Sequence, residues 1–96
     1  MKQYTNESQT AKLIELGFEK PSSIASVEPI YGMGGISVAK AYTIGELIEM
    51  LGYDLYSMHY LGMSWEVKGE HLAVIKEELI DALYDMVVKL KDEGVI

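Results

Sequence analysis

The clearest pattern of hydrophobic and polar positions lies in the last third of the chain. Glu77, Asp81 and Asp85 are spaced four apart, as on the solvent-exposed surface of a helix. Gly94 stands where such a helix would end. We therefore predict one long helix from about Glu70 to Glu93. Its apolar stripe advances by three or four residues and consists of Leu72, Ile75, Leu79, Leu83, Met86, Val87 and Leu90.

Two shorter helices are predicted from their capping signals. Asn6 and Gln9 have the spacing of a capping box at the start of a first helix. Thr43 and Glu46 form a T-x-x-E capping box ahead of a second helix, which Gly52 closes. Because a helix of about eight residues is not stable alone in water, the second one must pack its apolar face on another element.

Two β-hairpins are predicted between these helices. Ile24–Tyr31 and Ile36–Tyr42 are rich in β-branched and aromatic residues, and the glycine-rich segment 32–35 can form the turn between them. Met63–Lys68 alternates strictly between apolar and polar residues, as a strand with one buried face does. Leu55–Tyr60 precedes it as its expected partner. Strands joined by such short turns pair in the antiparallel sense.

The expected fold is a single α+β domain spanning residues 1–96, since a chain of this length is one domain. The predicted order is α-β-β-α-β-β-α. We expect a two-layer arrangement in which helices cover a small, mostly antiparallel sheet made of the two hairpins. The long C-terminal helix should lie across the sheet with Trp65 beneath it. The pattern leaves open whether the two hairpins form one sheet.

The charge of the chain narrows the range of partners. Fifteen Asp and Glu residues stand against eight Lys, there is no Arg, and the formal net charge is −7. Readout of bases and clamping of phosphates rely largely on Arg, and a net negative charge repels nucleic acid and anionic membranes. We therefore expect no direct binding to nucleic acid or to a membrane.

The absence of cysteine excludes disulfides and Cys-ligated metal centres. No basic segment followed by an apolar stretch opens the chain, and no apolar run approaches the roughly 18 residues of a membrane span. The expected location is the cytoplasm.

Candidate chemical groups do not form a recognisable motif. His59, Glu66, Glu70 and His71 are of metal-ligating types, but the two histidines are twelve residues apart and match no metal-binding pattern. A G-x-S-x-G elbow and a cysteine nucleophile are both missing, and the glycine-rich turn matches no phosphate-binding motif. We expect no catalytic, cofactor-binding or metal-binding residues and no cofactor, although missing motifs do not settle whether the chain is an enzyme.

The most distinctive feature is the concentration of tyrosine in the second predicted hairpin. Tyr56, Met58 and Tyr60 alternate onto one face of the expected strand. Tyr and Met are enriched at protein interfaces, whereas the alternative is that this face is the core side of the sheet with its hydroxyl groups at the rim. The candidate interaction residues are Tyr53, Tyr56, Met58, Tyr60 and Trp65.

Several segments resemble a known group of sequences. Tyr42–Gly52, the strand that carries Trp65, Glu78–Ile96 and the opening segment Thr10–Phe18 are similar to small uncharacterised proteins of prophages and other mobile elements in gut anaerobic bacteria. The resemblance implies an origin and a fold. It implies no activity, because none is assigned to that group.

Three hypotheses for function follow. The first is a non-enzymatic protein–protein interaction module of phage or mobile-element origin, which binds a protein partner or a second copy of itself as a homodimer. The second is an acidic decoy that imitates nucleic acid and occupies a DNA- or RNA-binding protein. The third is a small-molecule-binding protein or metal-dependent enzyme.

Overall fold

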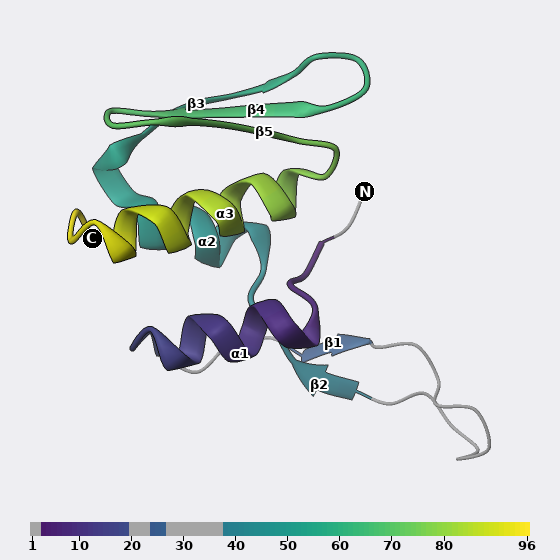
Figure 1. Ribbon diagram of the computed structural model, residues 1–96. Helices are drawn as coiled ribbons and strands as arrows, with labels where there is room; N and C mark the ends of the chain where they lie inside the picture. Colours follow the sequence, from purple (N-terminus) through teal and green to yellow (C-terminus); the bar gives the residue numbers. More distant parts are fainter. Residues whose placement is uncertain (1–2, 20–23, 27–37) are drawn as a thin grey trace.

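Two antiparallel sheets and three α-helices make up the described part of the chain, which is therefore an α+β protein, as predicted. The computed structural model describes residues 3–19, 24–26 and 38–96 (Figure 1). The elements in chain order are α1 (Glu7–Glu15), β1 (Ile24–Ser26), β2 (Val38–Lys40), α2 (Ile44–Leu51), the short 3-10 helix η1 (Gly52–Asp54), β3 (Leu55–Tyr60), β4 (Trp65–Gly69), β5 (Ala73–Lys76) and α3 (Leu79–Asp92).

The two predicted hairpins do not form one sheet. β1 pairs with β2 in a two-stranded sheet, and β3, β4 and β5 form a separate sheet in that order. All three pairings are antiparallel. The helix α3 packs on β4 and β5, and α2 packs beside α3 (Figure 1). β3 therefore lies at the edge of the sheet, farthest from α3.

The start of the predicted long helix is wrong. Residues 73–76 form the strand β5, and α3 begins only at Leu79. In β5 Val74 is buried opposite Val67, while its neighbours Ala73 and Ile75 are exposed, as in a strand with one face on the core. The helical spacing of Leu72, Ile75 and Leu79 is thus coincidental, and the element order contains one strand more than expected.

The same correction breaks the acidic row that was expected on the long helix. Glu77 precedes α3, so only Asp81 and Asp85 lie on it. Asp81 accepts a hydrogen bond of 2.8 Å from the side-chain amide of Gln9, and Asp85 pairs with Lys89 at 2.9 Å. These two carboxylates are therefore engaged within the chain.

Both predicted capping boxes are confirmed. The Asn6 side chain accepts a hydrogen bond of 2.8 Å from the backbone of Gln9, whose side chain accepts one of 3.0 Å from the backbone of Asn6. Thr43 and Glu46 make the equivalent pair at 3.1 Å each. Gly52 ends α2 with a positive φ of 56°, a conformation that costs glycine little.

The first predicted hairpin is described only in part. Its strands pair from Ile24 opposite Lys40 to Ser26 opposite Val38, and the predicted turn at 32–35 lies outside the described residues. Tyr42, which was expected in the second strand, instead follows it and is almost fully buried. Its hydroxyl group donates a hydrogen bond to the carbonyl oxygen of Glu19.

The main core lies between α3 and the larger sheet. Val67 and Val74 come from the sheet, Leu47 and Leu51 from α2, and Leu13 from α1. The helix α3 supplies the largest share of the core, with seven buried residues: Leu79, Ile80, Ala82, Leu83, Met86, Val87 and Leu90. Since burying one such large side chain is worth about 1.5–3 kcal/mol, α3 provides most of the hydrophobic stabilisation of the described core.

Two partly or fully buried tyrosines make stability depend on pH. Burial raises the pKa of Tyr42, and the charge of Glu46 raises it further. Burial likewise raises the pKa of Tyr84, with an additional contribution from Asp85. Above the ordinary tyrosine pKa of about 10, the unfolded chain therefore loses phenol protons that the folded chain keeps.

We expect the free energy of unfolding to fall as the pH rises above about 10, because the unfolded state then binds fewer protons than the folded state. The stabilisation from these two tyrosines is complete below that pH and is lost as the pH rises through their raised pKa values. Urea unfolding followed by circular dichroism at pH 8 and above pH 10 measures this slope. In the Tyr42→Phe and Tyr84→Phe variants the free energy of unfolding should fall less steeply with pH. An unchanged dependence on pH in both variants would contradict the raised pKa values of these two tyrosines.

Candidate functional site

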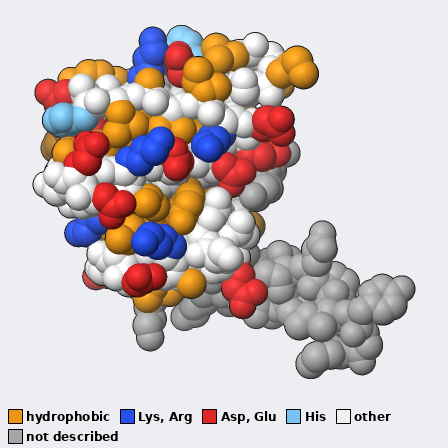
Figure 2. Space-filling view, viewed as in Figure 1, with side chains coloured by type: hydrophobic (Ala, Val, Ile, Leu, Met, Phe, Trp, Pro, Cys, Tyr) orange, Lys and Arg blue, Asp and Glu red, His pale blue; other side chains and the backbone are white. Residues whose placement is uncertain are grey.

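An exposed apolar surface covers β3 and the loop that follows it. In Figure 2 hydrophobic side chains gather on the upper part of the molecule, over the three-stranded sheet. The large exposed hydrophobic side chains of η1, β3 and the loop after β3 are Tyr53, Tyr56, Met58, Tyr60, Leu61 and Met63, and we call them the hairpin surface. Trp65, the fifth of the predicted interaction residues, is partly buried and packs against the core.

The register of the sheet explains why two of these side chains are uncovered. Met58 lies opposite Val67, and Tyr60 lies opposite Trp65, so they share the sheet face on which α3 packs. Val67 is fully buried, whereas Met58 is 38% exposed and Tyr60 61% exposed. The face is thus the core side along β4 but becomes solvent-accessible at β3, beyond the reach of α3.

Tyr56 departs from the predicted alternation. The register shifts between Leu55, which pairs with Gly69, and Ser57, which pairs with Lys68. One extra residue therefore stands in β3 at Tyr56, which is the arrangement of a β-bulge. Because the two-residue period is interrupted there, Tyr56 does not continue the face of Met58 and Tyr60 in the way that the sequence pattern indicates.

Aromatic packing holds the end of the hairpin. The ring centroids of Tyr60 and Trp65 are 5.1 Å apart with an interplanar angle of 46°. The Tyr60 hydroxyl group donates a hydrogen bond of 2.7 Å to the carbonyl oxygen of Gly62. With Glu77 and Glu78 the two rings line a shallow hollow next to the start of α3. Trp65 thus lies near the first turn of α3 and is only partly covered.

The edge of β3 carries no charge that would discourage association. From Leu55 to Trp65 the chain contains no Asp, Glu or Lys, although its net charge is −7. Natural edge strands are usually protected by Lys, Pro, a bulge or a covering element. Within residues 3–19, 24–26 and 38–96, the bulge at Tyr56 is the one such protection that β3 has. The other edge strand, β5, is better protected, because it is shorter, ends in Lys76 and has α3 packed on it.

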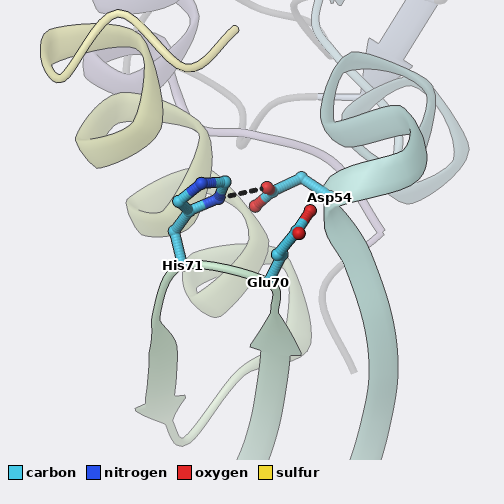
Figure 3. A group of neighbouring side chains, drawn as sticks. All are labelled: Asp54, Glu70 and His71. Atoms are coloured by element: carbon cyan, nitrogen blue, oxygen red, sulfur yellow. Dashed lines mark hydrogen bonds and ion pairs between the residues drawn. The ribbon is translucent and has the colours of Figure 1, made fainter.

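A second group of side chains lies where η1 meets the turn between β4 and β5. Asp54, Glu70 and His71 converge there (Figure 3), and one potential ligand atom from each lies within 4.8 Å of the others. His71 Nδ1 is 2.6 Å from Asp54 Oδ1. The Asp54 side chain is 7% exposed, whereas Glu70 and His71 are on the surface.

This group differs from the one that the sequence indicated. His59 and Glu66 face each other across β3 and β4, away from Glu70 and His71 along the sheet. Asp54 takes their place, a residue that sequence analysis missed. The signal that was missing is the register of the sheet. Leu55 pairs with Gly69 in antiparallel strands, so Asp54, which precedes Leu55, lies beside Glu70, which follows Gly69.

Comparisons with known proteins add no assignment. No protein-family model matches the chain, and neither the curated proteins nor the solved structures contain a significant match to it. The resemblance to proteins of prophages therefore stays a prediction. In the part of the chain that the structure describes, no helix is both long and apolar enough to cross a membrane.

Proposed function

We propose that this domain is a non-enzymatic interaction module that binds a further β-strand along the free edge of β3, and that this strand is β3 of a second copy. The observation that carries the proposal is the combination of an open edge with exposed apolar side chains and no charge. Such an edge presents unpaired backbone N–H and C=O groups, which an added strand satisfies.

The side chains of β3 add to what the backbone offers. Met58 and Tyr60 project beyond the cover of α3, and Tyr56 is exposed at the bulge. Large aromatic and Met side chains contribute much of the binding energy at protein interfaces because they bury considerable area. A strand paired with β3 would place its own side chains against this group.

Charge supports a second copy as the occupant. Two copies at −7 repel each other over most of their surfaces, but the uncharged stretch 55–65 can approach its equivalent without bringing like charges together. Antiparallel pairing of β3 with β3 about a two-fold axis is a self-complementary contact. It would join two three-stranded sheets into one continuous sheet.

We expect the purified chain to dimerise, as measured by sedimentation equilibrium over a range of concentrations. Met58→Lys places a charge on the free edge and should weaken the dimer at least about tenfold, equivalent to about 1.4 kcal/mol. The double variant Tyr56→Ala with Tyr60→Ala should weaken it through lost contact area. Ile75→Lys is the matched control, because it places the same charge on an exposed position of β5 and should leave the dimer intact.

A monomer at every concentration would reject the second copy as partner, and so would a dimer that Met58→Lys leaves unchanged. Circular dichroism of each variant separates lost association from lost folding. The acidic decoy, our alternative prediction, requires binding that weakens steeply with salt. It is less favoured because Asp81 and Asp85 are engaged by Gln9 and Lys89.

A further inference from the structure

The group formed by Asp54, Glu70 and His71 has the features of a metal-binding site. We propose that these three side chains bind a divalent transition-metal ion such as Zn²⁺ (Figure 3). They supply one imidazole nitrogen and two carboxylates within 4.8 Å of one another. This proposal is independent of the association through β3.

The strongest indication is an oxygen of Asp54 that has no partner. Oδ1 is within hydrogen-bond distance of His71, but Oδ2 is buried and has no hydrogen-bond partner among the described residues. A buried carboxylate oxygen without a partner is unfavourable, since it has lost its water. In the described part of the chain no lysine pairs with Asp54 or Glu70, and His71 contacts Asp54 through Oδ1 alone. A cation bound at Oδ2 and Glu70 would therefore offset the charge of both carboxylates.

The backbone holds the three residues in a defined arrangement. The N–H of Glu70 donates a hydrogen bond of 2.9 Å to the carbonyl oxygen of Asp54, and the N–H of Gly69 donates one of 2.9 Å to Leu72 across the turn. A Cβ atom on Gly69 would stand 2.9 Å from Asp54 Oδ2, so this oxygen lies directly against the β4–β5 turn. The donors thus come from two segments that are tied together next to the sheet.

The mixture of donors selects the class of metal. Imidazole and carboxylate ligands suit Zn²⁺ and its first-row neighbours, whereas Ca²⁺ and Mg²⁺ prefer sets made only of oxygen. At Zn–ligand distances of about 2.0–2.1 Å, neighbouring donors stand roughly 3.3 Å apart. Glu70 must therefore draw in, and Asp54 offers the metal Oδ2, its oxygen without a partner. Because Glu70 and His71 are exposed, water can fill the remaining positions.

The test is a titration of chelator-treated full-length chain with Zn²⁺ by isothermal calorimetry, together with thermal melts. We expect one Zn²⁺ per chain, a rise in Tm on addition of Zn²⁺, and no comparable effect of Mg²⁺. His71→Ala and Glu70→Gln should each weaken binding at least about 100-fold, the upper end of what loss of an outer-shell partner costs. His59→Ala is the matched control, since it removes the other histidine from the same sheet and should leave the affinity unchanged.

Three results would overturn the proposal: no Zn²⁺ binding by the parent chain, binding that survives both His71→Ala and Glu70→Gln, or equal loss in His59→Ala. Glu70 and His71 are surface residues, so their variants test the site even where Asp54→Asn fails to fold. Co²⁺ in place of Zn²⁺ gives an independent readout through its visible absorption, which should be lost in His71→Ala. Repeating the titration in the Met58→Lys background excludes a contribution from association.

Discussion

Leu83→Ala should lower the free energy of unfolding by about 3–4 kcal/mol. Leu83 is fully buried in the middle of α3, where it belongs to the cluster that joins the helix to the sheet. Truncating a buried leucine loses its transfer free energy and leaves a cavity, at a cost of about 2–5 kcal/mol. A chain of this length has a total stability of about 5–14 kcal/mol, so the loss is a large fraction of it.

Urea unfolding followed by circular dichroism measures this loss directly. The control is Lys89→Ala on the same helix, where a partly exposed ion pair with Asp85 is lost and the expected change is within about 0.5 kcal/mol. A loss below about 1 kcal/mol for Leu83→Ala would mean that α3 does not pack on the sheet in this way.

Gly69→Ala should cost about 2–3 kcal/mol although it adds a single methyl group. A Cβ atom at this position would meet the carbonyl oxygen of Asp54 at 2.6 Å and its Oδ2 at 2.9 Å. The first of these is backbone, and it cannot withdraw without disturbing the hydrogen bond from Glu70. Overpacking of this kind typically costs about 1–3 kcal/mol.

Gly45→Ala provides the opposite result as a control. A Cβ atom at Gly45 would come no closer than 3.8 Å to Thr43, and the position lies in the first turn of α2. Alanine there should stabilise the chain by about 0.5–1 kcal/mol, because it lowers the entropy of the unfolded state and favours the helix. Urea midpoints that shift in the same direction for both variants would refute the steric account of Gly69.

The features predictable from sequence are those decided by neighbouring residues. The capping boxes at Asn6 and Thr43 each involve two residues three apart, so local chemistry determines them. The strand pairing of β3 with β4 follows similarly from alternation and a short connection. The starts of α1 and α2 and this hairpin were therefore accessible without knowledge of the remaining fold, whereas the start of α3 was not.

The features that escaped prediction depend on partners distant in the chain. Residues 73–76 fit both a helical and a strand period, and it is the pairing of Val74 with Val67 that decides between them. Asp54 joins Glu70 and His71 only through the register of β3 and β4. The exposure of Met58 likewise depends on how far α3 extends over the sheet, which no short pattern encodes.

The position of α3 in the chain order has a consequence during protein synthesis. Seven of the thirteen residues in the core cluster belong to α3, which follows every strand in sequence. Until the ribosome has produced this helix, the inner face of the nascent sheet lacks the element that supplies most of the described core. Partly made chains with such exposed apolar strands are prone to aggregate or to recruit chaperones. The folding of this domain is therefore completed only once its last described helix has been translated.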